Sequence, residues 1–587
     1  MANSIKRIYE NFAGVDFLGE STLVAPNRSP DALNIYKNYD KNMGTCIQTR
    51  PGFKKLAQFP LKILGFYIYS SDKAIVHSGN NLYLWSNFPT SPATTEVLFD
   101  KMNLNEKSSY IILANKLYIV DKVNYLVFNG TEVKAVKEDA YIPTTTISRK
   151  PSGGGELLED VNVLQPKRIN TFVADGTSKD YFLDSTNIDS VDKVKVNDIE
   201  IALGTDYTYD KTRGKVTFIN PPETPSLAGI DNVEITYSKE ISGYIDRIEK
   251  CSKMVLFDNR IFYTGNSEFP NAIFNCKLNT PNYISDLDYY EDGASDSYIT
   301  DFTVGNNVLW VFKNNDKNNA NVFYHKSYID EKENRITYPS AKGNVGLGCI
   351  SKSYNFRDDI VYLSKNGLEG ISDDLQSGQA ISHRSSLIDN KMINENDYKN
   401  VELAEWKFYL LILVNGRIFL ADTNQKFQNL NSFEYEWYYW DISSLKPIIM
   451  KEHRAKIYIG SLYGSIYTLE GTNDNGETIV SYWTTKSDDF SYNNLYKTTN
   501  KRGGIAKFKT IPNSKIKLGV KTNKDNYYKN ITEKSTRGFS FINFSFIELT
   551  FTTSITNYLI YKIKEKKFNE LSMKFYSDEL DKPFRIV

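Results

Sequence analysis

Carboxylate groups are concentrated in one short stretch, DLDYYEDGASD, at residues 286–296. We single out Asp286, Asp288 and Asp292, because clustered carboxylates bind calcium and, in pairs, perform the acid and base steps of glycoside hydrolysis. The stretch lacks the DxDxDG spacing of calcium loops, and a solvated loop is the other interpretation. A second acidic stretch, GTNDNGE (471–477), contains Asn-Asp-Asn-Gly, which is first of all a turn sequence.

Other catalytic and metal-binding patterns are absent from the sequence. The four histidines and four cysteines form no HExxH motif and no cluster with zinc-site spacing. SGGGE (152–156) is glycine-rich, but the Lys-Ser/Thr of a phosphate-binding loop does not follow it. Neither a GxSxG nucleophile elbow nor the sialidase-type Asp-box SxDxGxTW occurs. We therefore expect no catalytic residue, no metal site, no cofactor and no enzymatic activity.

One segment carries a local excess of positive charge. Residues 497–524 contain nine Lys or Arg and no acidic residue. Lys507, Lys509, Lys515 and Lys517 alternate with apolar residues, so in strands they would share faces. Two interpretations remain open: a basic patch that contacts DNA or an acidic partner, and one solvated face of a β domain.

The composition predicts an all-β protein without a general affinity for nucleic acid. The chain has 41 Tyr and 33 Phe, residues that favour half-buried pleated surfaces. Lys plus Arg and Asp plus Glu number 71 each, so the chain lacks the strongly basic character of a dedicated nucleic-acid binder.

The cysteines and the apolar runs indicate the compartment. Four cysteines without CxxC spacing predict buried free thiols rather than a disulfide framework. No apolar signal-peptide region follows the N-terminal Met, and the longest apolar run, FYLLILV (408–414), is far shorter than the ~20 residues of a membrane-spanning helix. We expect a soluble protein that is made in the cytoplasm and has no membrane-spanning segment.

Seven short, similar apolar strands recur along the chain. Their first large apolar residues are Leu82, Leu117, Ile261, Val308, Ile360, Ile418 and Ile457. Most intervals lie near the roughly 40–50 residues of a propeller blade, and several copies have a second strand after a polar turn. The pattern predicts a β-propeller of about seven blades; an array of β-sandwiches is the alternative.

The long interval between Leu117 and Ile261 indicates an insertion. It opens with IPTTTISRKPSGGGELLED (142–160), which we interpret as a linker. VKVNDIEI (194–201) then alternates around an Asn-Asp turn, the signature of a hairpin. These features predict a small inserted β-sandwich module.

The repeat pattern and its interruptions divide the chain into five expected segments. These are an N-terminal arm (1–58), a first propeller part (59–151), the inserted β-sandwich module (152–240), a second propeller part (241–470) and a C-terminal β domain (471–587). Either the arm or a C-terminal strand is expected to complete a blade.

The arm carries the most specific sequence pattern. Asn11–Gly14 (NFAG), Pro30–Asn34 (PDALN) and Arg50–Phe53 (RPGF) follow one another in an order that resembles the start of tail-nozzle proteins of short-tailed bacteriophages. These proteins are also called tail tubular protein B or phage stabilisation proteins. The family usually has two glycines after the Phe, where this chain has Ala-Gly. The inserted hairpin, with Asp198 in place of glycine, resembles small β modules of phage tail proteins.

The resemblance implies a structural protein of the virion tail, made in the host cytoplasm. Copies of the chain, about six, would form a homo-oligomeric ring below the portal and adaptor proteins. The ring would pass genomic DNA without sequence specificity and dock tail fibres or a distal tip. The arm residues that we expect at an interface with a neighbouring subunit or partner are Phe12, Pro30, Leu33, Arg50 and Phe53.

Other functions remain open on the sequence. A propeller that binds or cleaves cell-surface glycans would use carboxylates such as Asp286, Asp288 or Asp292, and changing them to Asn would abolish that activity. Another tail position, such as a hub or a neck piece, and a non-viral binding propeller are the remaining readings.

Overall fold

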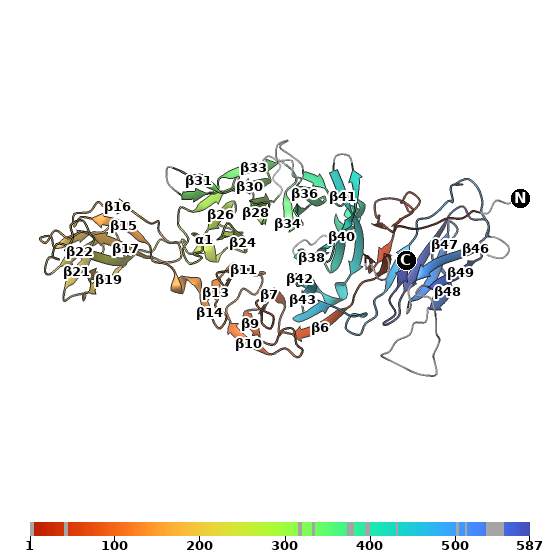
Figure 1. The fold of residues 1–587 in the computed structure, drawn as a ribbon, viewed down its shortest axis with the longest axis horizontal. Helices are drawn as coiled ribbons and strands as arrows, with labels where there is room; N and C mark the ends of the chain where they lie inside the picture. The colour runs from red at the N-terminus through yellow and green to blue at the C-terminus, as the bar shows by residue number, and fades with distance from the viewer. Residues whose placement is uncertain are drawn as a thin grey trace. The chain divides into compact units, whose positions relative to one another are not determined.

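The computed structural model describes residues 5–586 with ten gaps. The gaps are 40–44, 315–319, 332–334, 345, 372–380, 394–399, 430–431, 500–503, 511–513 and 536–556. In the described residues short β-strands dominate and the two α-helices are a single turn or little more, which confirms the all-β prediction (Figure 1). The chain forms two compact units: Met1–Gly79, Tyr83–Glu96 and Leu347–Val587 make the first, and Asn80–Leu82 and Val97–Gly346 the second.

Among the described residues, seven sheets have four strands each. Three of them lie in the first unit: β34 (Cys349–Phe356), β35 (Asp359–Ser364), β36 (Gly367–Ile371) and β37 (Ile381–His383); β38 (Glu402–Trp406), β39 (Tyr409–Val414), β40 (Arg417–Asn429) and β41 (Ser432–Asp441); β42 (Pro447–His453), β43 (Lys456–Ser461), β44 (Ser465–Leu469) and β6 (Phe53–Gln58). The short helices η2 (Ser386–Ile388), α2 (Asp389–Ile393) and η4 (Ser443–Leu445) connect strands of this group.

A further four-stranded sheet, β7–β10, follows the arm. Its strands are β7 (Ile63–Ile68), β8 (Ala74–Ser78), β9 (Asn81–Trp85) and β10 (Thr95–Phe99). The buried side chains of Phe66, Trp85 and Phe88 pack together beside Tyr458 of β43. Aromatic contacts of this kind extend the core between neighbouring sheets.

The second unit contains the other three four-stranded sheets. Their strands are β11 (Ser109–Leu113), β12 (Lys116–Val120), β13 (Tyr125–Phe128) and β14 (Val133–Ala135); β24 (Lys253–Phe257), β25 (Arg260–Thr264), β26 (Ala272–Asn275) and β27 (Tyr289–Glu291); β28 (Ile299–Gly305), β29 (Val308–Lys313), β30 (Val322–His325) and β33 (Ser340–Asn344). The connections contain η1 (Val136–Asp139), α1 (Asp246–Glu249) and the hairpin of β31 (Tyr328–Asp330) and β32 (Arg335–Thr337).

Each of the seven similar sequence strands occupies a middle position in one of these sheets. The strands are β9, β12, β25, β29, β35, β40 and β43. Their leading apolar residues, Leu82 to Ile457, are at most 4% exposed. In six of the seven, a two-residue turn with positive φ at both residues precedes the strand, for example Asn306-Asn307 and Asn415-Gly416. Type I′ hairpins require this conformation, which explains the recurring Asn, Asp and Gly before the strand.

The insertion in the second unit folds into two sheets with a core of their own. The strands are β16 (Glu156–Leu157), β15 (Thr144–Arg149), β17 (Lys167–Phe172), β23 (Val233–Ser238), β19 (Ser190–Val196) and β20 (Ile199–Glu200) in one sheet, and β18 (Asp180–Phe182), β22 (Lys215–Phe218) and β21 (Tyr207–Asp210) in the other. Buried Phe172, Tyr181 and Tyr237 belong to the core of this insertion. The predicted hairpin is confirmed: Asn197 and Asp198 have φ of 48° and 62° between β19 and β20.

The linker predicted at residues 142–160 is wrong. β15 lies parallel to β17, and β16 pairs antiparallel with β15 inside the six-stranded sheet. The run Thr144–Ile147 is rich in β-branched residues, and their preference for strands outweighs the Pro, Ser and Gly around them. Gly153, Gly154 and Gly155 all have positive φ and form the turn between the two strands.

The C-terminal residues of the first unit form sheets together with the N-terminal arm. The arm contributes β1 (Gly14–Val15), β2 (Arg28–Ser29), β3 (Ala32–Leu33), β4 (Ile35–Asn38) and β5 (Cys46–Thr49); the C-terminal region contributes β45 (Ser481–Thr484), β46 (Gly504–Thr510), β47 (Lys515–Thr522), β48 (Lys529–Ser535), β49 (Asn557–Ile563), β50 (Leu571–Ser577) and β51 (Arg585–Ile586). β3 is the edge strand of the sheet β3-β45-β50-β47-β48, and β5 pairs with β51. β6, at the end of the arm, pairs with β44 and completes its sheet. The arm thus folds onto its own chain.

Candidate functional site

The five arm residues singled out in the sequence lie inside the first unit. Phe12 packs edge-on against Trp483, with ring centroids 5.2 Å apart. Leu33 pairs with Tyr482 in the β3–β45 ladder, and half-buried Pro30 precedes this strand. Arg50 is 2% exposed and Phe53 is fully buried.

Two of these five residues, Arg50 and Phe53, are therefore buried within their own chain. Their side chains contact residues of their own chain. The physical reason is the pairing of β6 with β44, which draws Phe53 into the core of the first unit.

Arg50 is held by a two-point ion pair with Asp474. Its Nη1 donates to Asp474 Oδ1 over 2.8 Å, Nη2 donates to Asp474 Oδ2 over 2.5 Å, and Nε donates to Asn34 Oδ1 over 3.0 Å. The Phe53 amide also donates to Asp474 Oδ1 over 3.1 Å. Forked Arg–carboxylate pairs are geometrically specific, so this pair fixes the start of β6 against the 471–477 turn.

Gly52 permits that close approach. A Cβ built on Gly52 would lie 1.8 Å from the carbonyl oxygen of Asn473. The Arg-Pro-Gly-Phe pattern therefore has a structural explanation in this chain: Arg50 pairs with the carboxylate, Gly52 allows the backbone contact, and Phe53 enters the core.

Two other buried carboxylates hold the arm. Glu436 of β41 accepts from the Arg28 guanidinium, with an Nη2–Oε1 distance of 2.6 Å. Asp488, whose side chain is fully buried, accepts from Arg7 Nε and from the Tyr9 hydroxyl, each over 2.8 Å. Neither carboxylate is predicted from the sequence, because the residues of each pair are separated by more than 400 positions.

Asp422 of β40 holds the end of β4. It is fully buried and accepts a short hydrogen bond of 2.5 Å from the Tyr39 hydroxyl. Burial raises the pKa of Asp422 to about 6, although hydrogen bonds from Tyr39 and the Asn424 amide act in the opposite direction. Burial also lowers the pKa of nearby Lys37, whose ammonium donates to the carbonyl of Phe12 over 2.8 Å.

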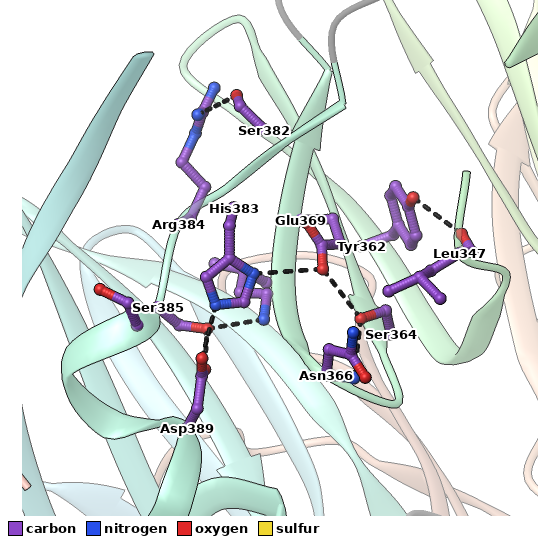
Figure 2. Close-up of polar contacts among 12 residues, drawn as sticks. Leu347, Tyr362, Ser364, Asn366, Glu369, Ser382, His383, Arg384, Ser385 and Asp389 are labelled. Atoms are coloured by element: carbon purple, nitrogen blue, oxygen red, sulfur yellow. Dashed lines mark hydrogen bonds and ion pairs between the residues drawn. The ribbon is translucent and has the colours of Figure 1, made fainter. Parts of the chain in front are cut away.

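One histidine, His383, lies between two carboxylates (Figure 2). His383 ends β37; its Nδ1 lies 3.2 Å from Glu369 Oε1 and its Nε2 lies 2.6 Å from Asp389 Oδ2. Both partners are acceptors, so the imidazole donates from both nitrogens and is positively charged. Burial lowers the pKa of His383, but the bonds and charges of Asp389 and Glu369 outweigh it and raise the pKa to about 10.

Hydroxyl groups and a glycine complete this His383 cluster. The Ser364 hydroxyl donates to Glu369 over 3.1 Å, and the Ser385 hydroxyl donates to Asp389 over 2.7 Å (Figure 2). Gly367 has a φ of 136°, and a Cβ there would lie 2.3 Å from Asp389 Oδ1. His383, Glu369 and Asp389 each have hydrogen-bonding partners in the chain, and these contacts link β36 and β37 to the start of α2.

Arg384 makes a separate set of contacts on the same strand end. Its guanidinium pairs with Asp359, with an Nε–Oδ2 distance of 3.1 Å, and lies 4.0 Å over the ring of Phe433. A Cβ on Gly370 would lie 2.6 Å from Arg384 Nε, so a larger residue there would require the guanidinium to move.

The N-terminal arm contacts the helices η2 and α2, which follow His383. The Phe17 amide donates to the carbonyl of Leu387, in η2, over 2.8 Å. The Lys391 ammonium, in α2, lies 4.5 Å from the Phe17 ring and 4.1 Å from the Tyr439 ring. The His383 cluster thus positions a docking point for the arm. The sequence contains only four histidines, but nothing in it identifies Glu369 and Asp389 as the partners of His383.

The acidic residues proposed for calcium or glycan chemistry have separate partners. Asp286 accepts from the Tyr244 hydroxyl over 3.2 Å, and Asp288 pairs with Lys277 over 2.7 Å. The structure does not bring them together as a site: among the described residues, no three His, Cys, Asp or Glu side chains are grouped so that they could hold a metal ion.

Asp292 is fully buried rather than solvated. Its carboxylate accepts from the Ser340 hydroxyl and lies 3.0 Å from His325 Nε2. His325 Nδ1 lies 2.7 Å from the carbonyl of Tyr338, so this imidazole also donates from both nitrogens. Burial lowers the pKa of His325, but the hydrogen bond and charge of Asp292 raise it overall.

Two of the four lysines expected in the basic patch are neutralised. On β47, Lys515 forms an ion pair with Glu579, and Lys517 forms one with Asp578 over 2.6 Å. Lys507 and Lys509 lie on β46, which belongs to a different sheet. The four residues therefore do not share the face of one sheet.

The cysteine prediction is confirmed. Cys46, Cys251, Cys276 and Cys349 are buried and free. Burial raises the pKa of the Cys276 thiol to about 12, which disfavours a reactive thiolate.

Comparison with known proteins identifies no family. No protein-family model matches the sequence, and no curated protein matches it. Among solved structures, the computationally designed Ika8 protein aligns with a TM-score of 0.32 at 10% identity, covering 71% of this chain and 99% of that chain. BamB from Moraxella catarrhalis aligns with a TM-score of 0.31 at 11% identity (75% and 94% covered). YCF48 bound to D1 peptide aligns with a TM-score of 0.33 at 8% identity, covering 72% of this chain and 97% of that chain. These TM-scores are too low to support an argument.

In the part of the chain that the structure describes, none of the helices combines the length and the apolar character of a membrane-spanning segment.

Proposed function

We propose that this chain is a structural subunit of a bacteriophage tail channel, built as a seven-bladed β-propeller with an inserted module and a C-terminal β domain. The seven four-stranded sheets would be the blades. Support for a closed propeller within one subunit comes from β6. This strand, from residues 53–58, completes the sheet of residues 447–469 and so joins the first part of the repeat array to the last.

The observation that carries the proposal is the role of the arm pattern. The residues that resemble the phage tail-nozzle start, Arg50 to Phe53, lead directly into β6 and are fixed by Asp474. The resemblance therefore falls on residues that lead into the strand paired with β44. Copies of the subunit, about six, would surround a lumen that passes DNA passively, and the chain would have no turnover.

The glycan-directed alternative has weaker support. Asp286 and Asp288 each have a partner in the chain, and Asp292 is buried. A screen of host polysaccharides with the wild-type protein and with Asp286→Asn plus Asp288→Asn tests it: binding or cleavage that the double variant abolishes would favour this alternative.

Ring formation is tested by light scattering after size exclusion, followed by negative-stain imaging of the same peak. The subunit mass is 67.3 kDa. A mass of several subunits with a central hole in the particles is the expected result. A monomer at all concentrations, both alone and with purified portal–adaptor complexes, would overturn the proposal.

A further inference from the structure

One face of the two-stranded sheet β46–β49 alternates lysine with apolar side chains. The strands are antiparallel. The cross-strand pairs on this face are Ile505–Lys562, Lys507–Ile560 and Lys509–Tyr558. Every pair joins one cation to one apolar or aromatic residue; we call these six residues the β46–β49 face.

The opposite face of the same sheet is packed into the C-terminal core. Phe508 stacks on Tyr561 with centroids 5.4 Å apart and meets Phe575 edge-on at 4.9 Å. Leu559 and Ile563 are each 5% exposed. The sheet is therefore a supported platform, and the side chains of the β46–β49 face are held outward by the strand alternation.

The apolar members of the face are unusually exposed. Ile505 is 68% exposed, Tyr558 56% and Ile560 43%. A row of exposed apolar side chains on a sheet that is packed on its other face indicates a surface that contacts something other than water.

The charge of the face has one sign. Neither strand contains an acidic residue. Within the described part of the chain, Lys507, Lys509 and Lys562 form no ion pair, in contrast to Lys515 and Lys517 on β47. The Lys507 ammonium lies 4.1 Å over the Tyr558 ring, and the Lys534 ammonium joins the border of the face at the Ile560 carbonyl, over 2.6 Å.

The combination of residue types narrows the class of partner. A nucleic-acid surface uses lysines and stacking aromatics and gains little from exposed isoleucines. A protein interface uses the isoleucines but is depleted in lysine. The interfacial region of an anionic membrane uses both, because lysines attract the headgroup phosphates while Ile and Tyr enter the boundary with the acyl chains.

We propose that the β46–β49 face binds the surface of an anionic phospholipid membrane, peripherally and without spanning it. This inference is independent of the channel function, since it rests only on the C-terminal sheet. Multiple copies of the chain would strengthen the binding through avidity.

The test is co-sedimentation of the full chain with vesicles. Vesicles of phosphatidylcholine with about one-third phosphatidylserine are expected to bind the protein, and pure phosphatidylcholine vesicles are not. Each lysine contributes about fivefold in affinity, so the variant Lys507→Gln, Lys509→Gln, Lys562→Gln should lose about a hundredfold. Ile505→Ser with Ile560→Ser should also weaken binding, and this loss should persist at high salt.

A matched variant controls for net charge. Lys116→Gln, Lys179→Gln, Lys211→Gln removes three exposed lysines elsewhere and should bind vesicles like the wild type. Circular dichroism checks that each variant is folded. The proposal is overturned if the wild type does not bind anionic vesicles, or if the control variant loses as much vesicle binding as the face variant. It is also overturned if the wild type binds DNA but not vesicles and the face variant loses that DNA binding.

Discussion

The guanidinium of Arg50 and the carboxylate of Asp474 meet in a forked ion pair across 424 positions of sequence. The side chains are 1% and 11% exposed. The pair fixes β6 where it completes the sheet of β42–β44. Breaking it should therefore loosen the arm and the sheet together.

Asp474→Asn tests this pair. Removing one partner leaves a buried guanidinium without its counter-charge, so the free energy of unfolding should fall by about 3 kcal/mol. Urea denaturation followed by tryptophan fluorescence measures the change. Asp296→Asn, at an exposed carboxylate, is the control and should stay within about 0.5 kcal/mol of the wild type. Equal stability of the two variants would contradict the assigned role of Asp474.

Gly52→Ala tests the backbone contact beside the pair. The added methyl group would lie 1.8 Å from the Asn473 carbonyl oxygen, and separating them should cost about 1–3 kcal/mol. Thermal melting is a sufficient readout. Gly19→Ala has no atom closer than 4.0 Å and should melt like the wild type. If both variants melt alike, the close approach of Gly52 to Asn473 is not as described.

His383→Gln tests the charged cluster through its pH dependence. The pKa of His383 is about 10 in the folded chain and 6.5 for an unperturbed histidine. The stabilisation from protonated His383 is therefore complete below pH 6.5 and is lost as the pH rises through about 10. The stability difference between wild type and variant should be largest at pH 6 and small at pH 10.5.

The control for removing a histidine is His453→Gln, on β42 outside the cluster. Denaturation at several pH values between 6 and 10.5 compares the three proteins. A wild-type advantage over His383→Gln that stays constant across this range would argue against a charged imidazole between Glu369 and Asp389.

Asp422→Asn is expected to gain stability relative to the wild type at a lower pH than His383→Gln does. The pKa of Asp422 is about 6 in the folded chain against 3.8 for an ordinary aspartate, so the wild-type free energy of unfolding falls as the pH rises from about 4 to about 6. The Asn variant keeps a hydrogen-bond acceptor for Tyr39, and because Asn does not ionise, its free energy of unfolding does not fall from this cause over this pH range. Relative to wild type it should gain on the order of 2–3 kcal/mol between pH 4 and pH 7.

Chemical denaturation across that pH range measures the Asp422 effect. Asp296→Asn again controls for the loss of an ordinary exposed carboxylate. A relative stability of Asp422→Asn that does not change with pH would show that Asp422 is not the buried acid described above.

The sequence by itself determined the local structure. Short apolar strands, each followed or preceded by Asn, Asp or Gly turns, specify hairpins, because few residues adopt the positive φ of type I′ turns. Their recurrence predicted the seven middle strands, and the VKVNDIEI turn was found where expected. The prediction from local sequence was wrong at residues 144–149, which form a strand although a glycine-rich turn follows them.

Only the tertiary structure decided which charges meet. Arg50 with Asp474, Arg28 with Glu436 and Tyr39 with Asp422 are contacts between the arm and residues about 400 positions away. Nothing in the local sequence selects these partners, because pairing of β3, β5 and β6 with late strands brings them together. The same reason separates the lysines of residues 507–517: strand pairing gave Lys515 and Lys517 acidic neighbours and left Lys507 and Lys509 on another sheet.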